Sequence, residues 1–266
     1  SLKYQLMNPV TKKILASGIC ERIGIDGVLK HEYNDGKKLV LNEAMPTHKE
    51  AINAVLTTLT SGEGKVIEST NDIEAIGHRT VHGGEEFASS VLITPNVVEA
   101  MKRLSPLAPL HNPANILGIE ICQELMPGKP NVGVFDTAFH QTMPDYAYMY
   151  ALPYEMYTKH GIRKYGFHGT SHYFVSNEAR GMLEKKHNTR IIVCHLGNGS
   201  SVSAVFDGKC ISTSMGLTPI QGLMMGTRVG DIGAGAIQYM MKQENKDIDE
   251  VLDIMNKKSG ILGISG

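Results

Sequence analysis

The stretch from Arg190 to Phe206 constrains the fold most, because it places a glycine-rich loop between two apolar segments. Residues 191–194 read Ile-Ile-Val-Cys and predict a buried strand that stops at His195. Residues 202–206 alternate in polarity and predict a second strand, which ends at the turn Asp207-Gly208. The pattern therefore predicts two strands joined by a flexible connection.

The connection, residues 195–201, reads His-Leu-Gly-Asn-Gly-Ser-Ser. Glycine lets a backbone approach a ligand closely and adopt positive φ, and successive N–H groups in such a loop form a cradle for an anion. The residues of the loop alone allow two interpretations: a phosphate-binding loop, or a glycine-rich hairpin without a ligand.

Composition narrows the class of protein. The chain has 266 residues, 42% of them hydrophobic, and a net charge of −1, which is typical of a globular protein long enough for two domains. The charge balance offers no basic field for nucleic acid, no apolar run has membrane-spanning length, and residues 1–6 resemble no targeting peptide. The four scattered cysteines predict packing residues in a reducing compartment, so we expect a cytoplasmic protein.

Both ends of the chain look incomplete, since strand-like alternation starts at residue 1 and residues 259–266 stop within an apolar stretch. Residues 1–8 also resemble residues 201–208. A hairpin repeated in this way predicts duplicated domains, with the first copy of the glycine-serine loop expected just before Ser1. Chance similarity between hairpins is the alternative.

The rest of the chain reads as alternating helices and strands. Thr47 and Glu50 form a capping-box pattern, and Thr94-Pro95 is a second helix start. Helices are expected over 47–60, 94–104, 114–125, from about 172 to 186, 234–243 and 248–256; strands over 2–6, 13–20, 73–81 and 131–135; a long loop over 146–157; and a packed glycine-rich loop over 212–231.

Three residues stand where such elements begin or end. Arg79 lies near a strand end, where it would meet a ligand or form a surface ion pair. Asp136 directly follows a buried strand, where it would face a ligand or cap a turn. His168 precedes a helix that Thr170 or Ser171 could cap, a position that favours a neutral imidazole beside an anion. His168 and His172 are four residues apart, but capping explains this spacing better than a metal site.

Six motifs in order resemble the acetokinase family of short-chain carboxylate kinases, within the actin, hexokinase and Hsp70 ATPase superfamily. They begin at residues 78 (HRTVHGGE), 107 (LAPLHNPAN), 134 (VFDTAFH), 165 (YGFHGTSH), 195 (HLGNGSS) and 215 (MGLTP, continuing to GTRVGD at 226). The resemblance implies reversible phosphoryl transfer from ATP to acetate, giving acetyl phosphate and ADP, with Mg²⁺ or Mn²⁺.

The resemblance also implies roles for individual residues. The catalytic set is Arg79, Asp136, His168 and Arg228. The acyl-substrate set is Arg79, Val81, Leu110, His111, Phe167 and Pro219. The ATP set is Lys3, His195, Leu196, Gly197, Asn198 and Gly199. Asp136 matches a proton donor or acceptor, yet a carboxylate substrate has no proton to lose at neutral pH, so orienting the substrate or a metal-bound water is the better role.

The implied fold is α/β, with two duplicated ribonuclease-H-like domains in which mixed sheets are flanked by helices. Residues 1–137 are predicted to be the acyl-substrate domain and residues 138–266 an incomplete nucleotide-binding domain. The family's adenine loop and a Mg²⁺-binding Glu are expected beyond Gly266, so no metal ligand is assigned here apart from Asp136 acting through water. A homodimer is expected, without nucleic-acid or membrane partners.

Two alternatives remain at this point. One is a propionate or butyrate kinase of the same family. The other is a non-catalytic, nucleotide-regulated binding module, although such a module has no need for Arg79, Asp136, His168 and Arg228 in their motifs.

Overall fold

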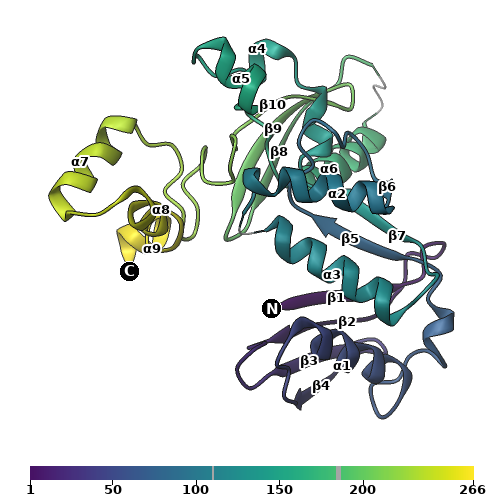
Figure 1. Ribbon diagram of the computed structural model, residues 1–266. Helices are drawn as coiled ribbons and strands as arrows, with labels where there is room; N and C mark the ends of the chain where they lie inside the picture. Colours follow the sequence, from purple (N-terminus) through teal and green to yellow (C-terminus); the bar gives the residue numbers. More distant parts are fainter. Residues whose placement is uncertain (110, 184–186) are drawn as a thin grey trace. The chain divides into compact units, whose positions relative to one another are not determined.

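A computed structural model describes residues 1–109, 111–183 and 187–266 (Figure 1). The strands are β1 (Leu2–Met7), β2 (Ile14–Glu21), β3 (Val28–Tyr33), β4 (Lys37–Asn42), β5 (Ile76–Thr80), β6 (Val91–Leu92), β7 (Asn131–Phe135), β8 (Arg190–Leu196), β9 (Ser200–Phe206) and β10 (Lys209–Thr213). The α-helices are α1 (His48–Thr60), α2 (Pro95–Leu104), α3 (Asn112–Leu125), α4 (Asp145–Tyr148), α5 (Tyr154–His160), α6 (Gly169–Met182), α7 (Ala234–Glu244), α8 (Ile248–Lys257) and α9 (Gly260–Ser265). Short 3₁₀ turns lie at Thr70–Asp72, Ser105–Leu107 and Ala138–Thr142. The α/β class predicted from the sequence is confirmed.

The chain divides into two compact units. The first contains residues 1–78 and 114–132, and the second contains residues 79–113 and 133–266. The division falls inside β5 and β7, which belong to a sheet of order β5-β7-β6. The predicted boundary between functional domains at residue 137 stays a prediction.

The first unit contains a meander of four antiparallel strands in the order β1-β2-β3-β4. Alternate residues of its strands point to one face and pack with α1, where Ala16, Cys20 and Leu29 form the centre of a core. Helix α1 begins with the predicted capping box. The N–H of Thr47 donates to Glu50 Oε2 at 2.9 Å, and the N–H of Lys49 donates to Thr47 Oγ1 at 3.1 Å. This part of the first unit thus owes its fold to period-two patterning and one well-capped helix.

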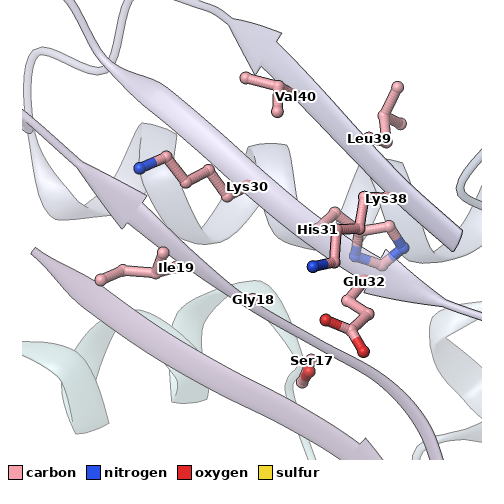
Figure 2. Close-up of a pocket in the computed structure, with 9 residues that line it drawn as sticks. All are labelled: Ser17, Gly18, Ile19, Lys30, His31, Glu32, Lys38, Leu39 and Val40. Atoms are coloured by element: carbon pink, nitrogen blue, oxygen red, sulfur yellow. The ribbon is translucent and has the colours of Figure 1, made fainter. Parts of the chain in front are cut away.

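The other face of this sheet carries both charged and apolar side chains and is shallowly hollowed (Figure 2). Lys30 and Glu32 project from β3 beside Ser17 and Ile19 of β2 and Val40 of β4, and the hollow has a volume of about 290 Å³. None of the predicted site residues that the structure describes lines it.

The second unit contains the strand-loop-strand feature that the sequence predicted. Strands β8, β9 and β10 form an antiparallel sheet, and Asp207 and Gly208 both have positive φ in the turn between β9 and β10, as expected of an Asp-Gly hairpin. Helix α6 packs against β8. In this register His195 of β8 lies opposite Ser201 of β9, which places two polar side chains at the end of the sheet.

Both hairpins that resemble each other in sequence are antiparallel pairs. Strand β1 pairs with β2, and β9 pairs with β10, each with a register shift near the turn. The structural likeness agrees with the predicted duplication.

Some sequence-based expectations were wrong. Residues 146–157 contain parts of two short helices, α4 and α5, rather than a continuous loop. Helix α6 begins at Gly169 and ends at Met182, earlier than expected at both ends. Strand β8 extends through His195 to Leu196, and the strands β3, β4 and β6 and the helix α9 were not predicted. Three cysteines are buried as expected, but Cys194 is exposed on β8.

Within the described ranges 1–109, 111–183 and 187–266, no helix is both long and apolar enough to cross a lipid bilayer.

Replacing Leu29 tests the importance of the first unit's core. Leu29 is fully buried, so L29A is expected to cost about 2–5 kcal/mol of the free energy of unfolding through lost burial and a cavity. The control V40A shortens an exposed side chain on the opposite face and should have little effect. Urea unfolding followed by circular dichroism measures both variants, and equal midpoints would contradict this account of the core.

Candidate active site

The glycine-rich loop between β8 and β9 is held by its own hydrogen bonds. The N–H of Gly197 donates to the carbonyl of Gly199 at 3.1 Å, and the hydroxyl of Ser200 donates to the carbonyl of Gly197 at 3.0 Å. The N–H of Gly226 donates to the carbonyl of Asn198 at 3.0 Å, which ties the loop to the segment that carries Arg228. The loop is thereby a fixed part of the site.

Close approach, rather than positive φ, explains the glycine at position 199. Gly197 and Gly199 are not among the residues with positive φ, contrary to one reason offered from the sequence. A Cβ at Gly199 would instead lie 3.3 Å from both Arg228 Nη1 and His168 Nε2. The loop, the start of α6 and the segment after residue 214 therefore meet around Gly199.

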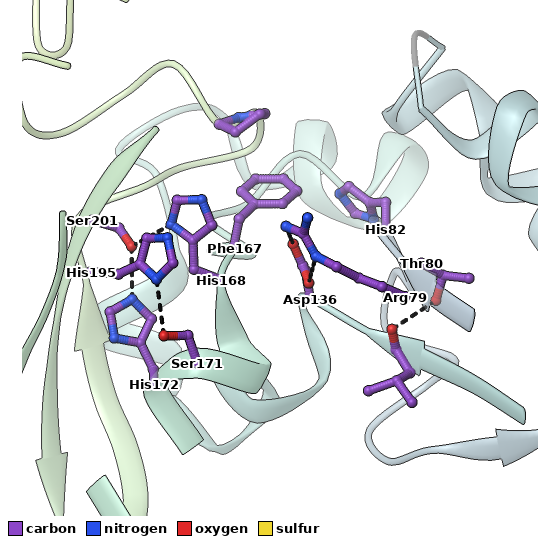
Figure 3. A network of polar contacts seen from close by, with 12 residues as sticks. Arg79, Thr80, His82, Asp136, Phe167, His168, Ser171, His172, His195 and Ser201 are labelled. Atoms are coloured by element: carbon purple, nitrogen blue, oxygen red, sulfur yellow. Dashed lines mark hydrogen bonds and ion pairs between the residues drawn. The ribbon is translucent and has the colours of Figure 1, made fainter. Parts of the chain in front are cut away.

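Arg79 and Asp136 form a two-pronged ion pair (Figure 3). Arg79 Nε donates to Asp136 Oδ1 at 3.0 Å, and Arg79 Nη2 donates to Asp136 Oδ2 at 2.6 Å. The Asp136 side chain is 3% exposed, whereas that of Arg79 is 67% exposed, so the carboxylate is a buried anchor for a guanidinium that reaches the surface. Hydrogen bonding to Asp136 raises the pKa of Arg79. Arg79 thus forms an ion pair and still presents its charge to the cleft.

Two imidazoles stack at the opposite side of the network in Figure 3. The rings of His168 and His195 have centroids 4.0 Å apart, and His195 Nδ1 lies 2.9 Å from Ser171 Oγ. Ser171 and Thr170 do not cap α6: the residue before the helix is His168 itself, in the left-handed conformation with φ of 58° and no side-chain cap. Burial, followed by the charges of His195, Arg79 and Arg228, lowers the pKa of His168 to about 4. His168 is therefore neutral at pH 7, as the sequence predicted.

These groups line one open cleft within the second unit, with a volume of about 490 Å³. Its lining residues are Arg79, Asp136, His168, Thr170, Ser171, Phe174, His195, Gly197, Asn198 and Gly199. Arg228 approaches the same loop, and its Nη1 donates to the carbonyl of Pro219 at 3.0 Å. Burial lowers the pKa of Arg228, which favours binding of an anion beside it. The cleft combines two guanidiniums with backbone and imidazole donors, a set suited to phosphate oxygens.

The predicted acyl-pocket residues lie partly together. Val81 packs against a buried cluster of Phe167, Met215 and Met225. The sequence analysis assigned no role to either methionine, although Met215 begins one of the six motifs, because a flexible apolar side chain does not by itself indicate a ligand. Burial, Arg228 and Arg79 lower the pKa of His111, with a smaller opposing effect of Asp136, which places His111 near these charges. Leu110 lies outside the described residues.

Only some of the residues predicted to bind ATP line the cleft. His195, Gly197, Asn198 and Gly199 line the cleft, whereas Leu196 is exposed at the end of β8. Lys3 lies on β1 in the first unit, whereas the residues that line the cleft belong to the second unit. Sequence reasoning also assigned no role to Ser201 or His172, whose contacts depend on strand pairing.

Asp136 is the only acidic side chain among the described residues that line the cleft, and Arg79 engages both of its oxygens. The described residues contain no cluster of three or more His, Cys, Asp or Glu side chains able to hold a metal ion. This donor set alone is too small for a protein-built magnesium site, since Mg²⁺ favours octahedral oxygen coordination.

The chain is similar to known proteins over its whole length. The model of the Acetokinase family matches residues 1–266. An acetate kinase of Helicobacter hepaticus is 56% identical, with 100% of this chain and 67% of that protein covered. An acetate kinase of Agathobacter rectalis is 57% identical with the same coverage. This chain therefore spans about two thirds of the length of these relatives.

Solved structures agree with these sequence matches. The crystal structure of Porphyromonas gingivalis acetate kinase has a TM-score of 0.94 and 47% identity, and covers 99% of this chain and 67% of that one. The structure of a propionate kinase from Francisella tularensis has a TM-score of 0.92 and 45% identity, with the same coverage.

The contact between α6 and Asp136 supplies one prediction. A Cβ at Gly169 would lie 2.2 Å from the carbonyl oxygen of Asp136, which accepts the Gly169 N–H at 2.9 Å. G169A should therefore push α6 from Asp136, lower stability by about 1–3 kcal/mol and reduce anion binding in the cleft.

The matched control is G181A in the same helix, where a Cβ would meet no atom within 4 Å. Alanine is the better helix former, so G181A should leave stability unchanged or slightly raised. Thermal unfolding and isothermal titration with inorganic phosphate measure the pair. Equal behaviour of the two variants would contradict the required close approach at Gly169.

The buried histidines predict how stability depends on pH. Burial is the first cause that lowers the pKa of His140 to about 4 and that of His172 to about 3, and both side chains are fully buried. In the unfolded chain the histidine pKa is near 6.5, so between pH 6.5 and the lower pKa values of the folded state the unfolded chain binds more protons than the folded one. The contribution of these neutral histidines to the free energy of unfolding should therefore be fully present above pH 6.5. It should fall as the pH is lowered, by up to about 1.4 kcal/mol per pH unit for each histidine.

Urea titrations between pH 7.5 and 4.5 measure this slope, with H140Q expected to reduce it because glutamine does not titrate. A slope that H140Q leaves unchanged would contradict the assignment to His140.

Proposed function

Because the chain belongs to the acetokinase family, we propose that it transfers the γ-phosphoryl group of ATP to acetate, giving acetyl phosphate and ADP, in a reversible reaction. It is a phosphotransferase with a carboxyl group as acceptor. The duplicated ribonuclease-H-like architecture accompanies this family membership, and the match with acetate kinase structures over 99% of the chain supports it.

The convergence of Arg228 Nη1 and His168 Nε2 on Gly199, with Arg79 lining the same cleft, supports this proposal most directly. A phosphoryl group in transfer carries charge on three equatorial oxygens, and catalysis of its transfer consists mainly of positioning and charge stabilisation. Two guanidiniums supply positive charge, and a neutral imidazole supplies an N–H donor without repelling them. The loop around Gly199 supplies a backbone wall at close range.

The transfer itself needs few protein groups. A carboxylate oxygen of acetate attacks the γ-phosphorus in line, the bond from that phosphorus to the β,γ-bridging oxygen breaks, and its electron pair leaves with ADP. Arg79 binds the acetate carboxylate and the moving phosphoryl group, while His168 and Arg228 stabilise the equatorial oxygens. The small apolar space bordered by Val81 and Phe167 receives the methyl group, with Leu110 and Pro219 as further proposed wall residues.

Asp136 acts by holding Arg79 rather than by moving a proton. Acetate is ionised at neutral pH and has no proton to give up. The two hydrogen bonds from Arg79 instead use both carboxylate oxygens and set the direction of the guanidinium. A rigidly oriented guanidinium loses less entropy when it binds an oxyanion.

Nucleotide binding requires residues of the β8–β9 loop. We propose that His195 and residues 196–199 contact the ATP phosphates and that Lys3 adds a cation. Mg²⁺ or Mn²⁺ would enter with these phosphates, since Asp136 is already paired. When bound, the metal would neutralise phosphate charge. A cytoplasmic homodimer is proposed from the family alone.

A propionate kinase is the second candidate, favoured by the likeness to the Francisella tularensis structure. An extra methylene changes specificity by only about 1–3 kcal/mol, so propionate should be a poorer substrate than acetate rather than an excluded one. Comparison of kcat/KM on acetate, propionate and butyrate distinguishes the two. A non-catalytic nucleotide-binding module would show no transfer to any of them.

Removing either guanidinium tests the proposed roles. R228A and R79A should each lower kcat by about 10³-fold or more, because a cationic clamp on the transferring group is lost. R79A should also raise the KM for acetate. The assay follows acetyl phosphate as its hydroxamate at saturating ATP and Mg²⁺.

The control R103A removes an exposed arginine that pairs with Glu86 on the surface of the same unit, and it should retain normal rates. Near-normal kcat in R79A or R228A would refute the role of that arginine.

A further inference from the structure

Ser201 lies between two histidines in the wall of the cleft (Figure 3). Its Oγ is 2.9 Å from His168 Nδ1 and 2.7 Å from His172 Nε2. Ser201 and His172 are both fully buried, whereas His168 borders the cleft. Strand β9 supplies the serine and helix α6 the second histidine, so the contact joins the sheet to the helix behind the site.

The number of hydrogens available determines the direction of the two hydrogen bonds that Ser201 makes with His168 and His172. A serine hydroxyl has one hydrogen and cannot donate to both rings. Both rings are neutral at pH 7, because burial lowers the pKa of His168 to about 4 and that of His172 to about 3. Each ring therefore carries its single N–H on one of its two nitrogens.

The second ring nitrogen of His172, Nδ1, decides which of its two nitrogens carries the proton. Its Nδ1 is buried and has no hydrogen-bond partner anywhere in the described ranges 1–109, 111–183 and 187–266. A buried N–H without an acceptor is rarer and more costly than a buried acceptor without a donor. The proton of His172 accordingly belongs on Nε2, from which it donates to Ser201 Oγ.

The other histidines nearby do not compete for this hydroxyl. His140 contacts the Phe167 carbonyl through Nε2 and Cys210 Sγ through Nδ1, and His195 contacts Ser171. Once Ser201 accepts from His172, its own hydrogen is directed to His168 Nδ1. His168 must then carry its proton on Nε2, the atom that faces Gly199 together with Arg228 Nη1.

We propose that His172 and Ser201 are positioning residues that fix His168 as the Nε2–H tautomer, so that its single donor faces the phosphoryl group. This inference rests on the proposed function of the cleft, because it concerns how His168 presents a donor to an anion. The opposite tautomer would direct a lone pair at the phosphate oxygens and repel them. The hydrogen-bond chain therefore lets a neutral histidine serve as a donor of fixed direction.

The tautomer can be observed without any catalytic assay. In protein labelled with [¹⁵N]histidine, long-range ¹H–¹⁵N correlation spectra at pH 7 distinguish protonated from unprotonated ring nitrogens, and H168N assigns the His168 signals by their loss. We expect an unprotonated Nδ1 and a protonated Nε2 in His168. In S201A the Nδ1 should lose its donor, and the spectrum should move toward a mixture of tautomers.

The matched control is S203A, two residues along the same strand. Ser203 is also fully buried, and its hydroxyl contacts Thr213 rather than a histidine. S203A should leave the His168 signals unchanged. A protonated Nδ1 in the unaltered protein, or an identical His168 spectrum in S201A, would overturn the proposal.

A second pair of variants covers the case in which S201A does not fold. In H172Q the side-chain amide can still donate to Ser201, whereas H172F offers no donor. H172Q should keep the Nε2–H tautomer of His168, and H172F should lose it; equal spectra would overturn the proposal.

Kinetics provide a separate readout of the same variants. Loss of one orienting hydrogen bond should lower kcat about 5- to 10-fold in S201A and H172F with the KM for acetate nearly unchanged. If phosphoryl transfer is undetectable in the unaltered protein, the proposed function fails, while the spectra still decide the tautomer. If transfer is normal but the spectra show no effect of Ser201, only the tautomer proposal fails.

Discussion

The geometry of the cleft depends on Asp136. Its backbone N–H donates to the carbonyl of Thr80, and its own carbonyl accepts from Gly169 at the start of α6, both at 2.9 Å. Its side chain binds Arg79 through two hydrogen bonds. One residue after β7 thus joins strand β5, helix α6 and the proposed cationic clamp, and a shift of this residue would move all three.

Electrostatics explain why the Asp136–Arg79 pair is stable and why Arg79 can still bind an anion. A buried carboxylate is costly without a partner, so Asp136 requires the guanidinium that it orients. Arg79 keeps most of its side chain exposed and can therefore also meet an anion from the cleft. His168 opposite remains neutral because burial, together with the charges of His195, Arg79 and Arg228, lowers its pKa to about 4, and a neutral ring does not repel the guanidiniums. The cleft concentrates positive charge on two groups and uses the His168 imidazole as an uncharged donor.

Local chemistry made much of the fold predictable. The Thr47–Glu50 capping box, the start of α2 after Thr94 and the Asp207-Gly208 turn were all found where the sequence predicted them, because each depends on residues adjacent in the chain. The short helices around residues 146–157 were missed because tyrosine and proline are poor helix formers and packing outweighs their propensities. Seven predicted catalytic or phosphate-loop residues line one cleft: Arg79, Asp136, His168, His195, Gly197, Asn198 and Gly199.

The sequence by itself predicted many of the strands and helices and, through six ordered motifs, the family and the residues that are proposed to be active. Only the tertiary structure decided which polar groups pair. Ser171 could have capped α6 but lies against His195, and Ser201 lies between two histidines about thirty positions before it in the chain. Hydrogen bonds act over about 3 Å, and the partners that come within that distance are chosen by strand register and by the packing of α6 on β8, which no local pattern specifies.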